Sequence, residues 1–142
     1  MNARILVADD DAELRQLLRL ILQRDSYDVI EAADGEQTLA RAIDSTPALI
    51  LLDVIMPGVN GFDTCRRLKS DGRTHSVPVI FVSALNDTHS RTEGLNAGAE
   101  DYMAKPIDPR DLSQRVRSVI QRSRINLLFN GTASQKPLLD NR

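Results

Sequence analysis

The sequence predicts an α/β fold in which helices cover both faces of a single parallel β-sheet. Short apolar runs alternate along the chain with longer amphipathic stretches, a pattern typical of parallel strands joined by crossover helices. The chain has 142 residues, of which 42% are hydrophobic and 27% are charged, as expected for one globular domain. Right-handed crossovers give a doubly wound sheet, and such folds place their chemistry outside the carboxyl ends of the strands.

Five short apolar runs are the predicted strands. The first, third and fourth runs are almost entirely apolar, as expected for central strands that are buried on both faces of a sheet. The predicted strands cover residues 5–8, 27–31, 49–52, 77–82 and 102–104.

The first two helices are predicted from an apolar stripe and from capping residues. The stripe repeats at helical spacing and consists of Leu14, Leu17, Leu18, Ile21 and Leu22. Asp11 precedes this helix, and we expect its side chain to cap the first turn rather than to bind a ligand. A second helix is predicted to start at the capping residue Asp34 and to run towards the breaker Pro47.

Three further helices are predicted in the second half of the chain. The third follows Asn60 and Gly61 and ends near the turn residues 71–72. The fourth lies within residues 86–98 and has few apolar positions, so we expect it to be the most mobile helix. The fifth starts behind Pro109, and its apolar residues are Leu112, Val116, Val119 and Ile120.

The C-terminal segment is predicted to be an extension of a domain that covers residues 1–123. We expect the fifth helix to continue into residues 124–142 as far as Phe129 and to stop at Asn130-Gly131. This extension is indicated by apolar residues at near-helical spacing, namely Ile120, Leu127 and Leu128. A second copy of the chain, or an output domain that we do not expect within these 142 residues, would bury them. Residues 132–142 are polar and are expected to form a linker or disordered end.

Charge and composition narrow the classes of partner. The formal net charge of -2 gives no basic footprint, so direct binding to nucleic acid is not expected. No apolar stretch approaches the ~20 residues that span a bilayer, and no basic region precedes a long apolar one at the N-terminus. We therefore expect a cytoplasmic protein without membrane association.

The single cysteine, Cys65, is expected to pack in the core, and His75 and His89 are expected at the surface.

Polar residues follow four of the five predicted strands. Asp9 and Asp10 follow the first strand, and Asp53 follows the third. Ser83 ends the fourth strand, and Lys105 follows the fifth. Two like charges ~4 Å apart repel by roughly 4 kcal/mol at an effective dielectric constant of about 20, so three clustered carboxylates need more positive charge than one lysine supplies. Mg²⁺ prefers oxygen ligands and would supply it.

A carboxylate beside such an ion is a candidate nucleophile. Asp53 would attack an incoming phosphoryl group and form an aspartyl phosphate. Lys105 and the Ser83 hydroxyl would then neutralise charge on the phosphoryl oxygens, which is most of what this step requires.

Over roughly residues 3–122 the sequence resembles the receiver domain of bacterial two-component response regulators, and in particular the chemotaxis-regulator-like members. The motifs that carry the resemblance agree in order and spacing. They are Ile5-Leu-Val-Ala-Asp9-Asp10, Leu52-Asp53-Val-Ile-Met-Pro57 with Gly58 and Gly61, Val82-Ser83-Ala84, Ala97-Gly98-Ala99, and Asp101-Tyr102 followed by Lys105-Pro106.

The resemblance implies a flavodoxin-like (βα)5 fold with strand order 2-1-3-4-5 and a Mg²⁺ site for which Mn²⁺ is an alternative. It implies that Asp10, Asp53 and the carbonyl of Ile55 bind the metal, that Asp9 assists through water, and that Asp53 is phosphorylated. Lys105 would pair with the acid or phosphoryl oxygens, and the Lys105-Pro106 peptide would be cis.

The resemblance also implies a signalling domain rather than an enzyme, catalysing only its own phosphorylation and dephosphorylation. The phosphoryl donor would be a histidine kinase, a phosphotransfer protein or a small acyl phosphate. On phosphorylation Ser83 would move towards the phosphoryl group and Tyr102 would turn inward. This would alter the face made by the fourth helix, fifth strand and fifth helix, which would control a homodimer or an output domain.

Two positions depart from the polar residues that relatives often have at the rim of the site. They are Ile55 and Leu85, which cannot orient a hydrolytic water, so we predict slow self-dephosphorylation. Gly58 and Gly61 are interpreted as turn glycines and not as a phosphate-binding loop.

Three alternative functions remain to be compared with this one. A haloacid dehalogenase-type phosphatase needs Asp-x-Asp at its nucleophile, whereas Val54 and Ile55 follow Asp53. A flavin-binding electron carrier needs a hydroxyl-rich phosphate loop where this chain has residues 9–11, all aspartate. A degenerate receiver would bind partners without phosphorylation, and the complete set of site residues argues against it.

Overall fold

The computed structural model describes residues 2–133 of the chain, in which strands and helices alternate throughout. The strands are β1 (Arg4–Ala8), β2 (Asp28–Ala32), β3 (Leu49–Leu52), β4 (Val79–Ser83) and β5 (Asp101–Ala104). The helices are α1 (Ala12–Arg24), α2 (Gly35–Ser45), α3 (Gly61–Ser70), α4 (Thr88–Asn96) and α5 (Pro109–Ala133).

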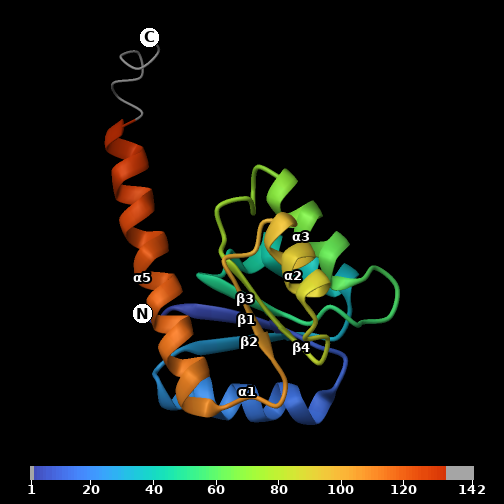
Figure 1. Cartoon of the computed structure of the whole chain (residues 1–142). Helices are drawn as coiled ribbons and strands as arrows, with labels where there is room; N and C mark the ends of the chain where they lie inside the picture. Colours follow the sequence, from blue (N-terminus) through green and yellow to red (C-terminus); the bar gives the residue numbers. More distant parts are fainter. Residues whose placement is uncertain (1, 134–142) are drawn as a thin grey trace.

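The five strands form one parallel sheet in the order β2-β1-β3-β4-β5. Helices α1 and α5 pack on one face of the sheet, and α2, α3 and α4 lie on the other (Figure 1). The predicted doubly wound fold and strand order are therefore confirmed. The order reverses between β1 and β3, and ligands of such sheets bind beside this point, outside the carboxyl ends of the strands.

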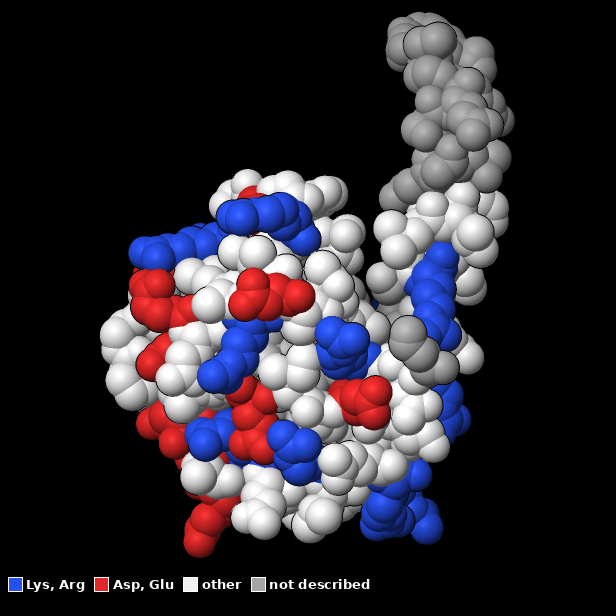
Figure 2. Space-filling view, turned by 180° about the vertical axis from the view of Figure 1, so that it is seen from behind, with Lys and Arg blue, Asp and Glu red and all other residues white. Residues whose placement is uncertain are grey.

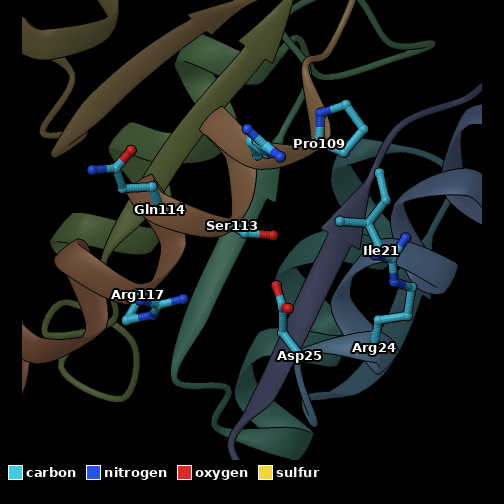
Figure 3. A pocket seen from close by; sticks show the side chains of 8 residues that line it. Ile21, Arg24, Asp25, Pro109, Ser113, Gln114 and Arg117 are labelled. Carbon is cyan, nitrogen blue, oxygen red and sulfur yellow. The ribbon is translucent and has the colours of Figure 1, made fainter.

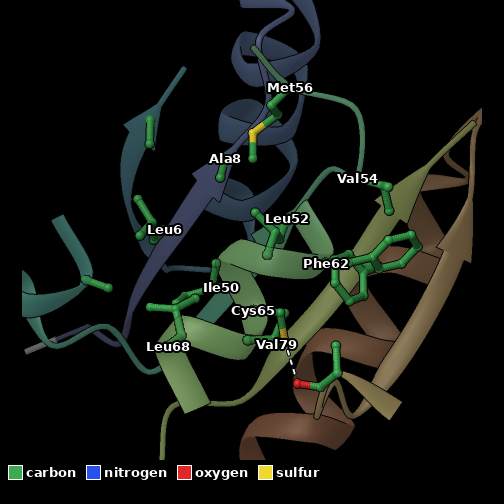
Figure 4. Packing of buried hydrophobic residues seen from close by; sticks show 14 of the residues in the cluster. Leu6, Ala8, Ile50, Leu52, Val54, Met56, Phe62, Cys65, Leu68 and Val79 are labelled. Carbon is green, nitrogen blue, oxygen red and sulfur yellow. Dashed lines mark hydrogen bonds between the residues drawn. The ribbon is translucent and has the colours of Figure 1, made fainter. Parts of the chain in front are cut away.

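The core consists of two apolar layers, one on each face of the sheet. Alternate residues of each strand point to opposite faces, so Leu6 joins the layer under α2 and α3 while Ile5 joins the layer under α1 and α5. Figure 4 shows the first layer, in which the Cys65 thiol donates a hydrogen bond to the carbonyl of Ala97 (3.4 Å). Cys65 is fully buried, which confirms its structural role.

Side-chain caps fix where four of the helices begin. Asp11 accepts hydrogen bonds from the first turn of α1, and Asp34 accepts one from the first turn of α2, as predicted. Asn60 and Asp87 cap α3 and α4 in the same way. Each cap satisfies backbone N–H groups that have no partner within the helix.

Four strands differ from the prediction by one or two residues at one or both ends. β1 begins one residue earlier than expected, at Arg4, and β2 and β4 each end one residue later. β2 begins at Asp28 because the N–H of Tyr27 still bonds to the carbonyl of Leu22 in the turn that closes α1. β4 begins after Pro78, because proline has no N–H to donate, and the Val77 N–H bonds back to the preceding turn. β5 begins one residue earlier than expected, at Asp101.

The predicted end of the last helix is wrong. α5 passes through Gly131 and ends at Ala133, with 25 residues in all. One glycine lowers helix propensity by only about 1 kcal/mol and leaves the backbone hydrogen bonds possible, so a helix that has already formed can continue through it. The predicted linker therefore begins two residues too early, and its remainder, residues 134–142, lies outside the described residues. None of the helices within residues 2–133 is long and apolar enough to cross a membrane.

Candidate functional site

Three carboxylates meet at the carboxyl ends of β1 and β3. Asp9 and Asp10 follow β1, Asp53 follows β3, and one oxygen of each lies within 4.8 Å of the others. The register of the sheet causes this, because Ala8 pairs with Leu52 and the next residues then face each other. Asp9 and Asp53 are 2% and 5% exposed, whereas Asp10 is open to solvent.

Lys105 joins two of these acids. Its ammonium group lies 2.9 Å from Oδ2 of Asp9 and 3.1 Å from Oδ2 of Asp53. The Lys105-Pro106 peptide that follows is cis, as predicted. Burial alone would lower the pKa of Lys105, but the two carboxylates outweigh it and raise that pKa. One ammonium group thus serves two buried carboxylates.

The charge on Asp53 is only partly compensated. Burial and the neighbouring Asp9 carboxylate raise the pKa of Asp53, while Lys105 and the N–H of Ile55 act in the opposite direction. The site holds the three carboxylates of Asp9, Asp10 and Asp53 but a single ammonium group, that of Lys105. An excess of negative charge on converging oxygens fits a hard divalent cation, which prefers oxygen ligands.

Backbone and helix contacts hold the acids in place. Oδ1 of Asp9 accepts a hydrogen bond from the N–H of Asp11 (2.9 Å), and Oδ1 of Asp53 accepts one from the N–H of Ile55 (3.3 Å). Arg15 donates to the carbonyl oxygen of Asp9 (2.8 Å) while its Nε pairs with Glu31 on β2 (2.8 Å). The sequence analysis missed Arg15, because only the pairing of β2 with β1 brings Glu31 to this position.

Gly61 is not the turn glycine that the sequence suggested. Gly58 has a positive φ of 75° and fits that interpretation, but Gly61 is the first residue of α3. A Cβ at Gly61 would lie 2.1 Å from the carbonyl oxygen of Asp53 and 2.7 Å from Cα of Val54. Glycine is therefore required because the start of α3 lies directly against the backbone that carries Asp53.

Ser83 and Tyr102 lie next to each other beyond this cluster. The buried Ser83 hydroxyl accepts a hydrogen bond from the N–H of Leu85 (3.2 Å), and the Tyr102 hydroxyl donates to the carbonyl of Leu85. Burial raises the pKa of Tyr102, and a hydrogen bond with Ser83 opposes that rise. Tyr102 is only 2% exposed, so its ring already lies inward in this structure.

Helix α4 encloses the Tyr102 ring. The guanidinium of Arg91 lies over the ring, 5.3 Å from its centroid, and also hydrogen-bonds to Asn86. A Cβ at Gly94 would lie 2.9 Å from the ring, so α4 can approach Tyr102 only because residue 94 is glycine. The few apolar positions of α4 concealed this packing from the sequence analysis.

The two predicted rim residues leave the mouth of the site without a polar side chain at either position. Ile55 is 54% exposed, and Leu85 is partly buried against the core. The structure thus brings together Asp9, Asp10, Asp53 and Lys105, with Ile55 at the rim and with Ser83 and Tyr102 alongside. The roles of these residues remain predictions.

Comparisons with known proteins identify the family of this chain. The model of the response regulator receiver domain family matches residues 5–117. The transcriptional regulatory protein ResD of Bacillus subtilis is 36% identical over 138 residues, which are 97% of this chain and 56% of ResD. The response regulator PleD of Caulobacter vibrioides is 46% identical over 119 residues, which are 84% of this chain and 26% of PleD.

Solved structures show the same fold. The receiver domain of Francisella response regulator 1452 is 31% identical and matches with a TM-score of 0.80, covering 86% of this chain and 99% of that domain. The chain spans about half the length of ResD and about a quarter of PleD, so it corresponds to one part of those proteins. The chain belongs to the receiver domain family of two-component response regulators.

Proposed function

We propose that this receiver domain accepts a phosphoryl group on Asp53 in a reaction that requires Mg²⁺, with Mn²⁺ as an alternative. The observation that carries the proposal is the buried Asp53 carboxylate beside Asp9, with one ammonium group between them. Asp10, Asp53 and the Ile55 carbonyl would hold the ion, and Asp9 would assist through water. When bound, the ion supplies positive charge to the phosphoryl oxygens as they approach the carboxylates.

The chain's own residues provide the nucleophile and part of the charge. An oxygen of Asp53 attacks phosphorus, and the bond from phosphorus to the leaving group breaks with its electron pair departing on that group. The Lys105 ammonium group, which bridges Asp9 and Asp53, pairs with a phosphoryl oxygen. The Ser83 hydroxyl donates a hydrogen bond to another of these oxygens. Positioning and charge account for most of the catalysis of such a step.

We assign the phosphoryl donor to a histidine kinase or a phosphotransfer protein, with a small acyl phosphate as a substitute. Receiver domains of response regulators work with histidine kinases, and the family of this chain is established by its match to the receiver model. The chain acts as a signalling domain that catalyses only its own phosphorylation and dephosphorylation.

The output is proposed to pass through the face formed by α4, β5 and α5. Tyr102 links this face to the site, since its hydroxyl bonds to the carbonyl of Leu85, two residues after Ser83. On the same face Arg115 pairs with Asp101 (3.0 Å) and Asp111 (2.9 Å). If Arg115 paired with these acids of a second copy instead, the new ion pairs would favour a homodimer. The alternative is that this face passes the signal to an output domain of a longer protein.

The direct test is the intact mass of the chain after exposure to acetyl phosphate, with and without Mg²⁺. We expect one added phosphoryl group on the wild type only when Mg²⁺ is present. Asp53→Asn should remain unmodified, and Asp11→Asn, which alters only a helix cap, should be modified like the wild type. Addition without a divalent cation, or addition to Asp53→Asn, contradicts the proposal. No addition to the wild type with or without Mg²⁺ also contradicts it and favours a partner-binding domain that does not use this site.

The dimer proposal has a separate test. Sedimentation of the phosphorylated chain should show an increase in mass that Arg115→Ala reduces, because this substitution removes both pairs on the face. A monomer at all accessible concentrations would assign the signal to an output domain instead.

A further inference from the structure

A hollow of about 360 Å³ lies between the end of α1 and the start of α5, and neither Asp53 nor its partners Asp9, Asp10 and Lys105 line it (Figure 3). We name it the α1–α5 hollow. Its polar lining residues are Arg24, Asp25, Arg110, Ser113, Gln114 and Arg117. Three guanidinium groups from two helices therefore border one concave surface.

Among the described residues, these three arginines have no hydrogen-bond or ion-pair acceptor for their guanidinium groups. Within residues 2–133, every other Arg or Lys side chain except Arg122 and Arg124 makes a hydrogen bond or ion pair with the protein. The unpaired arginines are thus confined to the end of α1 and to α5. Figure 2 shows basic side chains along the edge of the molecule that α5 forms.

The charge of the hollow defines the ligand class. Three arginines and one aspartate give a formal charge of +2. Arg110 and Arg117 are seven residues apart and so lie on one face of α5, about 10 Å from each other along the helix. A phosphate monoester carries nearly two negative charges at neutral pH and three acceptor oxygens, which guanidinium groups bind in a bidentate manner. A carboxylate brings only one charge.

The remaining lining residues fit a small organic group on that phosphate. Ile21 and Pro109 provide apolar surface, while Ser113 and Gln114 provide hydrogen-bond donors. The volume lies at the lower end of the range for small-molecule pockets. A second copy of the chain is unfavourable here, because a twofold axis through the hollow would bring the same arginines together.

We propose that the α1–α5 hollow binds a small organic phosphate monoester. The test is an NMR titration of the metal-free chain with phenyl phosphate, using benzoate as the singly charged comparison. We expect saturable shifts in residues 21–25 and 109–117, and affinity for benzoate about tenfold lower. Arg110→Ala and Arg117→Ala should each weaken phenyl phosphate binding about tenfold. Arg122→Ala, an unpaired arginine of the same helix outside the hollow, should stay within about twofold of the wild type.

Several results would overturn the proposal. They are equal affinity for benzoate, equal effects of Arg117→Ala and Arg122→Ala, shifts confined to residues around Asp53, and an absence of saturable shifts at millimolar phenyl phosphate. The backbone spectra of the variants show directly whether each has kept its fold. Because the titration is done without metal and without a phosphoryl donor, its failure leaves the proposed role of Asp53 unaffected.

Discussion

Replacing Gly61 by alanine tests how closely the start of α3 packs against the backbone of Asp53. The added Cβ would lie 2.1 Å from the carbonyl oxygen of Asp53, whereas carbon–oxygen contacts are normally about 3.3 Å or longer. The neighbouring atoms belong to the backbone of Asp53 and Val54 and cannot rotate away. Either α3 or this backbone must therefore move by about 1 Å, which would also break the 2.8 Å hydrogen bond from the Gly61 N–H to the Val54 carbonyl.

We expect Gly61→Ala to lower the free energy of unfolding by about 1 to 4 kcal/mol. Overpacking of a buried site costs about 1 to 3 kcal/mol, a lost backbone hydrogen bond adds about 1 kcal/mol, and the better helix propensity of alanine returns at most about 1 kcal/mol. Urea denaturation followed by circular dichroism measures the change. Gly72→Ala is the matched control, because a Cβ at Gly72 meets nothing within 4 Å.

The control should leave stability unchanged or raise it by a few tenths of a kcal/mol, since alanine restricts the unfolded chain. If Gly61→Ala and Gly72→Ala have the same stability within about 0.5 kcal/mol, the close approach of α3 to Asp53 is wrong.

Three further predictions concern charge, hydrolysis and mobility. The pKa of Asp53 is raised in the folded protein, so its charged form costs stability at pH 7 and not below the unfolded pKa of about 4. Asp53→Asn in metal-free buffer should therefore raise the free energy of unfolding at pH 7. This gain should disappear as the pH falls below about 4 or when Mg²⁺ is added, and an equal gain at both pH values would contradict this. Ile55→Asn combined with Leu85→Glu should shorten the lifetime of the aspartyl phosphate several-fold, because the new polar groups can orient water. The decay of the phosphorylated mass measures this lifetime. An unchanged or longer lifetime would show that the two rim residues do not limit hydrolysis. Helix α4 buries only Ser90 and Gly94, so its amides should exchange with deuterium faster than those of α3; equal protection of the two helices would remove the basis for calling α4 mobile.

The parts of the fold that depend on local sequence could be predicted. Alternating apolar runs identified the strands, and capping residues such as Asp11 and Asp34 identified where helices begin, because both signals lie within a few residues of the feature. The site residues could also be found, since polar side chains that end neighbouring strands must meet at one edge of a parallel sheet. The strand order itself came from the family resemblance.

Features that depend on distant pairs were missed. Arg15 holds Asp9 and Glu31 only because β1 and β2 pair in a particular register. Glycine is required at positions 61 and 94 because backbone atoms or aromatic ring atoms from other parts of the chain lie too close for a Cβ. The length of α5 was underestimated because a glycine signal was given more weight than the continuity of an established helix.

The central claim is that a divalent cation joins Asp10 and Asp53 and so makes Asp53 reactive. It is tested most directly by Mn²⁺ titration of the chain, followed by electron paramagnetic resonance and competed with Mg²⁺. The account predicts one ion per chain in the millimolar range or tighter, binding at least about tenfold weaker in Asp10→Asn and Asp53→Asn, and unchanged binding in the helix-cap variant Asp11→Asn. No saturable binding, or equal loss in Asp11→Asn, would contradict it.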